Sequence, residues 1–152
     1  MPKLQNGFTK TELVAVIVIL GILAAVALPR YYDLQADARR AKADGTFSTV
    51  RSASAIAHSA YLVSGDASAA SVAVEGQAIA LANGYPSAAG IVSAVNRNAA
   101  EAPDENVIIT TEGATTTFAI KGASTPANCR VSYTEATAAG APPAITVTKA
   151  GC

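Results

Sequence analysis

The chain has 152 residues, and its 11 basic and 11 acidic side chains balance at neutral pH. This length suits one domain, and the balanced charge argues against a protein that binds nucleic acid by neutralising phosphates. A single His excludes most metal sites and most His-dependent catalysis. The sequence also offers no Ser-His-Asp set, catalytic carboxylate pair or phosphate-binding glycine loop, so we expect no enzyme, cofactor or metal site.

The first feature along the chain is an apolar segment, because residues 13–28 carry no polar side chain. As a helix these residues span about 24 Å, and residues 8–28 approach the ~20 residues that cross a bilayer. A cleaved secretory signal is the alternative, since small residues near the end of the segment imitate a cleavage site. Glu12 at its start, and a helical pattern that resumes after Pro29, favour a segment that is retained.

Residues 30–63 predict a continued helix, since small and apolar side chains recur there at spacings of three and four. These positions are Ala43, Phe47, Val50, Ser54, Ala57 and Tyr61. Joined across Pro29, residues 8–63 form one helix about 84 Å long, which a single globule cannot bury. We expect residues 8–28 to lie in lipid or among neighbouring copies and residues 29–63 to pack on the remaining chain. Pro29 should kink the helix by removing a backbone hydrogen bond.

Residues 64–152 change to short segments of period two between turn residues, which predicts a sheet. A four-stranded antiparallel sheet is expected from residues 106–112, 115–121, 130–134 and 145–149. A small hairpin of residues 72–74 and 77–81 and a short helix over residues 86–98 should precede it. The fold class is therefore α+β, with a long N-terminal helix packed on a four-stranded sheet.

The two cysteines, Cys129 and Cys152, bracket the last predicted hairpin and are most simply a disulfide. The loop they close has 24 residues counting both ends, for which the chain-entropy relation gives roughly 3 to 4 kcal/mol. The bond would tie down the last strand and imply an oxidising compartment. Two separate buried thiols are the alternative, whereas the spacing excludes a CxxC redox or zinc site.

The residues before the apolar segment carry a family resemblance. Gly7-Phe8-Thr9-Lys10-Thr11-Glu12, followed by that segment with Gly21 and Pro29, resembles the N-terminal signature of type IV pilins. The resemblance implies that a prepilin peptidase removes leader residues 1–7 by cutting between Gly7 and Phe8, and that the new N-terminal residue, Phe8, is N-methylated. It also assigns an assembly role to Glu12 and implies a long helix on an antiparallel sheet with a disulfide-closed C-terminal loop.

Residues 64–152, which we call the head, indicate a subgroup within this family. The stretch from Cys129 to Thr137, the closing Cys152 and residues 83–88 are similar to the mannose-sensitive haemagglutinin subgroup of type IVa pilins. The family implies a structural subunit that is a single-pass inner-membrane protein before assembly and part of an extracellular pilus afterwards, for adhesion, motility or DNA uptake. Its expected partners are other copies of itself, the prepilin peptidase and the pilus assembly machinery of the inner membrane.

Three alternatives remain open at this point. A minor pilin shares the same signature, and so does a pseudopilin of a type II secretion system. Pseudopilins commonly use a calcium site where pilins use the terminal disulfide, so the cysteines favour a pilus. A membrane-tethered enzyme or receptor domain is remote, because the sequence lacks a catalytic constellation.

Charged residues near the apolar segment allow two interpretations each. Glu12 could pair with the Phe8 amine of the next subunit, which would fix a register and offset a cost of ~2.5 to 3.5 kcal/mol for a charge in the bilayer, or it could lie at headgroup level. The sequence departs from the family at Lys10 and Thr11, where pilins usually carry apolar residues. Lys10 points about 200° away from Glu12 on a helix, so it could pair between subunits or be solvated at the cytoplasmic headgroups.

The polar residues that follow the segment are expected to have structural roles. A solvated helix face or contacts between stacked subunits would account for Arg30, Asp33, Asp37, Arg39, Arg40 and Lys42. Tyr31 and Tyr32 suit an aromatic belt at the membrane surface, or packing between subunits. His58 is a lone helical His, for which we expect a structural role.

Overall fold

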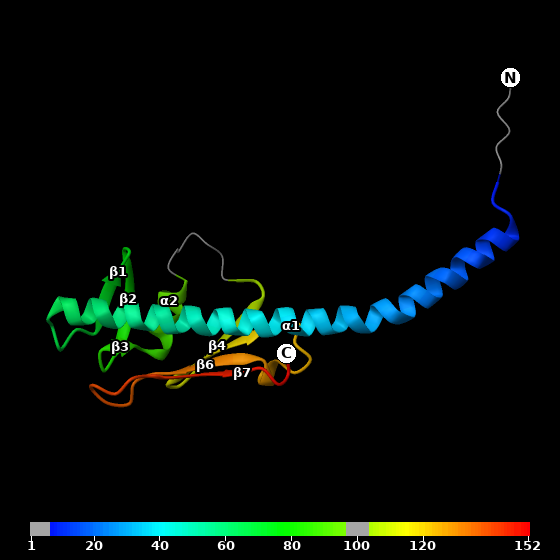
Figure 1. Cartoon of the computed structure of the whole chain (residues 1–152). Coiled ribbons are helices and arrows are strands. Elements are labelled where there is room, and N and C mark those ends of the chain that lie inside the picture. Colours follow the sequence, from blue (N-terminus) through cyan, green and yellow to red (C-terminus); the bar gives the residue numbers. More distant parts are fainter. Residues whose placement is uncertain (1–6, 97–103) are drawn as a thin grey trace, which may run out of the picture. The chain divides into compact units, whose positions relative to one another are not determined.

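The computed structural model describes residues 7–96 and 104–152 (Figure 1). Its contacts divide the chain into two units, residues 1–36 and 37–152. Most of the predicted leader and the end of the predicted helix over residues 86–98 lie outside the described residues. The fold is the α+β class expected, with one long helix, a four-stranded antiparallel sheet and a C-terminal disulfide.

The first unit consists of the N-terminal part of helix α1, which spans Lys10–Ser64 in all. The helix begins two residues later than expected, since Phe8 and Thr9 are not helical. It continues through Pro29 without a break in its assignment, and the kink at Pro29 stays a prediction. At the other end, in the second unit, Gly65 follows with a φ of +68°, the left-handed conformation that commonly ends helices.

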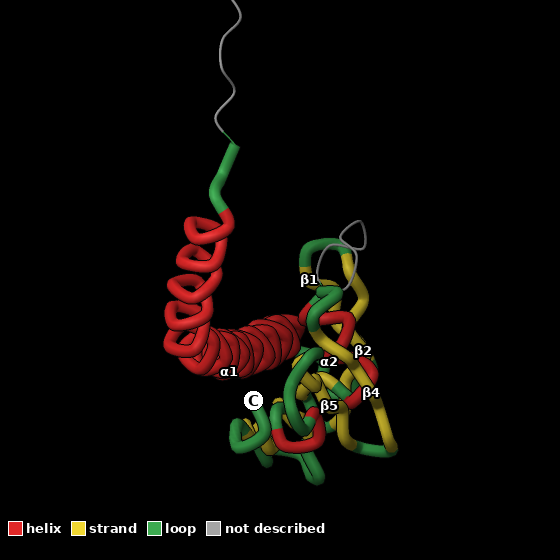
Figure 2. Tube along the Cα trace, turned by 90° about the vertical axis from the view of Figure 1, so that its right-hand side faces the viewer, coloured by secondary structure: helices red, strands yellow, loops and turns green. Residues whose placement is uncertain are grey.

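In the second unit, the remaining part of α1 buries the face that the spacing predicts. Ala43, Val50 and Ala57 are fully buried, and Ser54 is 3% exposed. Phe47 and Tyr61 are partly buried against the same core, which also contains Phe118 and Val131 of the large sheet. In Figure 2 the strands and α2 lie to one side of this part of α1. The small residues on the buried face therefore let the sheet approach the helix closely.

A three-stranded antiparallel sheet follows the helix. It is formed by β1 (Ser71–Val74), β2 (Gln77–Ala82) and β3 (Tyr85–Pro86), in that order. The predicted hairpin is thus confirmed, with a third strand added after Asn83-Gly84. Both hairpins turn on two residues of positive φ, Glu75-Gly76 and Asn83-Gly84, as tight hairpin turns require.

The short helix α2 spans Ala88–Val95 and begins later than the predicted residue 86. Pro86 belongs to strand β3, where it pairs with Leu81, and does not lie in the first helical turn. Ser87 is the N-cap, because its Oγ accepts a hydrogen bond from the Gly90 amide at 3.0 Å. A serine at this position caps a helix better than the proline directly before it can start one.

The four-stranded sheet is confirmed with small shifts in bounds. Its strands are β4 (Val107–Glu112), β5 (Thr115–Ile120), β6 (Arg130–Thr134) and β7 (Ala144–Thr148), all antiparallel and in sequence order. The 3₁₀ turn η1 (Pro126–Asn128) connects β5 to β6. Strands β4 and β7 therefore form the two edges of this sheet.

Buried polar contacts fasten the β3–α2 junction to the large sheet. The Tyr133 hydroxyl donates to the Pro86 carbonyl at 2.6 Å, and the Thr116 hydroxyl donates to the Ala88 carbonyl at 2.5 Å. The Glu135 carboxylate accepts from the Ala88 amide at 2.7 Å. Because each bond joins segments far apart in the sequence, together they fix how the helix α2 sits on strands β5 and β6.

His58 has the structural role expected of it. Its Nδ1 donates to the Gly84 carbonyl at 2.8 Å, and its ring stacks on that of Tyr85 with centroids 3.9 Å apart. The histidine thereby holds the turn between β2 and β3 against α1.

The disulfide between Cys129 and Cys152 is confirmed. Both cysteines are buried, in a small cluster with Ala43 and Ile120. Gly151 is needed beside it, since a Cβ there would come within 2.5 Å of the Thr125 carbonyl oxygen. The end of the chain is thus packed on the helix and the large sheet.

Candidate functional site

The residues of the predicted assembly site form the N-terminal cap of α1. The Glu12 amide donates to Thr9 Oγ1 at 3.3 Å, while Glu12 Oε2 accepts from the Thr9 amide at 2.9 Å and from Thr9 Oγ1 at 2.7 Å. This reciprocal arrangement is a capping box. The carboxylate assigned to assembly therefore also starts the helix.

Thr9 is the residue of this cap that the sequence patterns described above did not single out. Its signal was present, since a Thr followed three residues later by Glu, just before an apolar segment, is the pattern of a capping box. Gly7 and Phe8 precede this cap outside the helix, and Phe8 is 84% exposed. The bond predicted to be cleaved thus lies in accessible, non-helical chain next to Glu12, while cleavage and methylation stay predictions.

After the cap, α1 is apolar on all its faces as far as Leu28. Residues Lys10–Leu28 are long and apolar enough to cross a bilayer, and none of this stretch is buried in the structure. Its large side chains are 44% to 75% exposed, and they are Leu13, Val14, Val16, Ile17, Val18, Ile19, Leu20, Ile22, Leu23, Val26 and Leu28. An exposed apolar surface of this extent marks a segment that is covered by lipid or by other protein.

Some of the charged side chains of α1 in the second unit bind residues far away in the sequence, which a simple solvated face would not require. Arg39 Nε donates to the Cys152 carbonyl at 2.6 Å, Lys42 pairs with Asp104, and Lys149 pairs with Asp44 at 3.0 Å. All three contacts join α1 either to the end of the chain or to the residues just before β4. Sequence reasoning could not find these partners, because they lie more than 60 residues apart.

The remaining predicted charges do not decide between a solvated face and contacts between subunits. Arg40 pairs with Asp37 at 2.9 Å within the helix, and Arg30 is exposed. The side chains of Pro29, Tyr32 and Asp33 lie outside the description. Tyr31 is 61% exposed, and its role in a membrane-surface belt stays a prediction.

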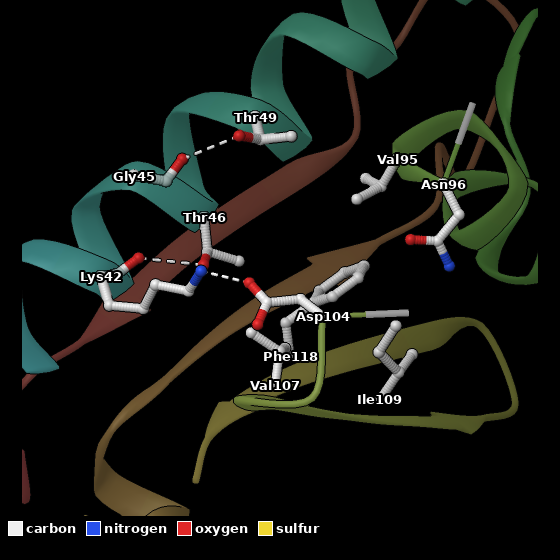
Figure 3. A pocket seen from close by; sticks show the side chains of 10 residues that line it. All are labelled: Lys42, Gly45, Thr46, Thr49, Val95, Asn96, Asp104, Val107, Ile109 and Phe118. Atoms are coloured by element: carbon white, nitrogen blue, oxygen red, sulfur yellow. Dashed lines mark hydrogen bonds and ion pairs between the residues drawn. The ribbon is translucent and has the colours of Figure 1, made fainter. Parts of the chain in front are cut away.

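A cavity of about 280 Å³ lies between α1 and the large sheet (Figure 3). Its apolar wall includes Val107, Ile109 and Phe118. Three of its polar side chains are already engaged within the second unit, since Lys42 binds Asp104, and the Thr46 and Thr49 hydroxyls donate to carbonyls one turn earlier. Among the described residues, most of the polar side chains that line the cavity are thus engaged within this unit, and the cavity carries no argument for a ligand.

Metal ligands do not gather in the part of the chain that the structure describes. Within residues 7–96 and 104–152, no three His, Cys, Asp or Glu side chains lie close enough to hold an ion. The features that stand out chemically are therefore the capped, exposed apolar helix and the disulfide-closed head.

Comparison with known proteins gives matches to pilus subunits over about a third of the chain. A type IV narrow pilus major component, PilA5, from Thermus thermophilus is 57% identical over 52 residues, which are 34% of this chain and 45% of that protein. The type IV major pilin PilE1 of Neisseria gonorrhoeae is 58% identical over 43 residues, 28% of this chain and 26% of the relative. A fimbrial protein of Pseudomonas aeruginosa is 43% identical over 51 residues, 34% of this chain and 33% of the relative.

The matched stretch spans less than half the length of each of these relatives. No family model matches the chain, and no solved structure matches it.

The fold and the site define a class of protein: an α+β head carried on a helix whose N-terminal part is apolar all round and begins with a capped carboxylate. The Gly7–Glu12 signature resembles that of type IV pilins, and these relatives, which carry pilin or fimbrial names, support the same resemblance. The narrower mannose-sensitive haemagglutinin subgroup stays a prediction.

Proposed function

We propose that this chain is a structural subunit that polymerises into a type IV pilus through residues 8–28 and displays its disulfide-closed head on the filament. The observation that carries the proposal is the apolar surface of Lys10–Leu28, which is bare in the single chain. A protein with this surface needs lipid while it is stored and neighbouring copies once it leaves the membrane. Named pilus components among its relatives support the same conclusion.

Processing would prepare this helix for assembly. A prepilin peptidase would cut between Gly7 and Phe8, and methylation of the new Phe8 amine would follow. The Thr9 amide and hydroxyl that bind Glu12 remain in the processed chain, so the capping box is compatible with cleavage. The Phe8 amine of one subunit would then meet the Glu12 carboxylate of the next, so that neither charge is left unpaired in the apolar core of the filament.

The life of the protein would therefore have two stages. Before assembly it is a single-pass protein of the inner membrane, handled by the pilus assembly machinery, and afterwards it belongs to an extracellular filament. The disulfide agrees with a head that folds outside the cytoplasm. The role is structural rather than enzymatic, and the filament would serve adhesion, motility or DNA uptake. A kink at Pro29 would adjust the direction of the helix between its two parts.

Deletion and complementation test the proposed function. Cells lacking this chain should lose a class of surface filament in electron micrographs, and expression of the wild-type chain should restore it. Filaments that bind an antibody against the head along their whole length would support a major structural subunit. Label at the filament tip alone would indicate a minor pilin, and unchanged filaments without label would contradict the proposal in favour of a pseudopilin.

A further inference from the structure

Lys10 is a positive charge at a position where the start of the helix disfavours one. From Phe8 to Leu28 the ionisable side chains are Lys10 and Glu12. Lys10 is the first residue of α1, and a cation at the N-terminal end of a helix opposes the helix dipole. It is exposed, at the start of a segment that can cross a bilayer. An ionisable residue in such a segment calls for a partner.

The partner is not Glu12 of the same chain. Residues two apart on a helix point about 200° away from each other, so their side chains do not meet. In addition, Glu12 Oε2 already accepts two hydrogen bonds from Thr9. The second carboxylate oxygen, Oε1, accepts none from the described residues, and it is the open position of this group.

We infer that Lys10 of one subunit binds the Glu12 carboxylate of a neighbouring copy in the filament through Oε1, beside the capping box that holds Oε2. This inference rests on the proposed polymerisation and specifies the surface by which copies recognise one another. The two charges are complementary, and burying them together removes an unpaired cation and an incompletely bonded carboxylate from the apolar core.

The placement of the two groups also gives the contact a direction. Lys10 and Glu12 lie on opposite sides of one helix. In each copy, Lys10 therefore binds Glu12 of one neighbour, while Glu12 binds Lys10 of another. A contact between two different surfaces does not close on itself as a two-fold dimer does, and it can continue as a helical array. The axial offset between the two groups is two residues, about 3 Å of helical rise.

The competing explanation is that Lys10 extends its ammonium group to the lipid headgroups, as lysines near membrane surfaces do. In that case the lysine matters before assembly, and it has no specific protein partner within the filament. The two explanations differ in what lies within bonding distance of Lys10 Nζ in the finished filament.

Zero-length cross-linking of sheared filaments separates them. An apolar carbodiimide joins an amine to a carboxylate only where the two touch, and trypsin cannot cleave after an acylated Lys10. The inference predicts a peptide in which residues 8–30 of one copy are joined to residues 11–30 of another. Joining through the Phe8 amine alone would instead attach residues 8–10 to residues 11–30, and that result would overturn the inference while leaving the filament intact.

Two further results would also overturn it. A single peptide of residues 8–30 that has lost one water would show pairing within one subunit, and the absence of any cross-link at Lys10 would show that the ammonium group has no carboxylate partner. If the sheared material contains none of this chain, the proposed function itself fails, which is a separate result.

Substitution gives an independent readout. Lys10→Met should reduce filament yield by about tenfold or more, because the Glu12 carboxylate keeps the Phe8 amine but loses its second cation, which binds Oε1. Lys121→Met is the matched control, since Lys121 is exposed in the head. The headgroup explanation predicts processed Lys10→Met protein that assembles as well as the control, and that outcome would contradict the intersubunit contact.

Discussion

Thr9 and Glu12 form a local structure around the carboxylate to which we have proposed a role in assembly. The capping box satisfies backbone groups at the start of α1 and holds the Glu12 side chain in one position. A carboxylate that is already oriented loses less side-chain entropy when a neighbour binds it. Thr9 therefore positions the group on which the proposed contacts depend.

Removal of the cap should loosen the first turn of the helix. We expect Thr9→Val, which keeps the shape of the side chain but not its hydroxyl, to cost about 1 kcal/mol of local stability. Amide hydrogen exchange of Glu12 and Leu13 in the full chain in micelles should accelerate roughly fivefold as a result. Thr9→Ser is the control and should exchange as the wild type does; equal rates in all three proteins would show that the cap does not hold this turn.

Tyr133 is a buried residue of the head whose hydroxyl needs a hydrogen-bond partner. It is fully buried, and its hydroxyl donates to the Pro86 carbonyl at 2.6 Å. Burial, with the Glu135 carboxylate nearby, raises the pKa of the Tyr133 hydroxyl to about 12. The folded head therefore keeps Tyr133 protonated where an unfolded chain, with a tyrosine pKa of about 10, releases the proton.

Tyr133→Phe should lower the free energy of unfolding by about 1 to 3 kcal/mol, because the buried Pro86 carbonyl loses its donor. Denaturant unfolding of the full chain in micelles measures this, with the exposed Tyr31→Phe as the unchanged control. The wild type should also lose stability as the pH rises from about 10 to 12, since deprotonation favours the unfolded state. Tyr133→Phe should lack this part of the pH dependence; identical pH profiles would contradict the assignment.

Helix α1 distributes its apolar side chains differently in its two parts. Its N-terminal part is apolar on every face, which suits lipid or a filament core, whereas its second part carries a narrow stripe of small residues that packs on the sheets. Charged contacts from Arg39, Lys42 and Asp44 tie this second part to the end of the chain and to the edges of the large sheet. The disulfide closes the same region covalently.

Loss of the disulfide should weaken the head at strand β7. The closed loop corresponds to about 3 to 4 kcal/mol in the chain-entropy relation, so Cys129→Ser/Cys152→Ser should lower the melting temperature by about 10 °C or more. Calorimetry of the full chain, oxidised and reduced, measures this. Reductant should lower the melting temperature of the wild type to that of the variant and leave the variant unchanged; a variant that melts with the oxidised wild type would contradict a stabilising role.

The sequence predicted the elements whose signals are local. The stripe from Ala43 to Tyr61, the strands of the large sheet and the Cys129–Cys152 bond follow from spacing, β-branched composition and cysteine count, and the structure confirms each. The start of α2 was placed too early because Pro86 competed with the Ser87 cap. The partners of Lys42 and Asp44 could not be predicted, because side chains so distant in sequence meet only once the tertiary fold is known.

In the whole molecule, we expect Glu12 to be necessary for assembly but not for folding or membrane insertion. We expect Glu12→Ala cells to contain membrane-inserted, processed protein and no filaments, because the variant retains the apolar helix and the head while losing the carboxylate that pairs with neighbouring cations. Immunoblots of membranes and electron microscopy of cell surfaces measure the two outcomes. Glu112→Ala, at an exposed strand end, is the control, and normal filament yield from Glu12→Ala would refute the role.

The intact mass of this protein in filaments sheared from the cell surface, measured with and without reductant, tests whether the chain builds a pilus. The account predicts the mass of residues 8–152 plus one methyl group, two hydrogens lighter until the disulfide is reduced. That single value would establish processing at Gly7–Phe8, methylation, the disulfide and filament membership together. Processed protein found only in the membrane fraction and absent from the sheared filaments would contradict the claim that this chain builds a pilus.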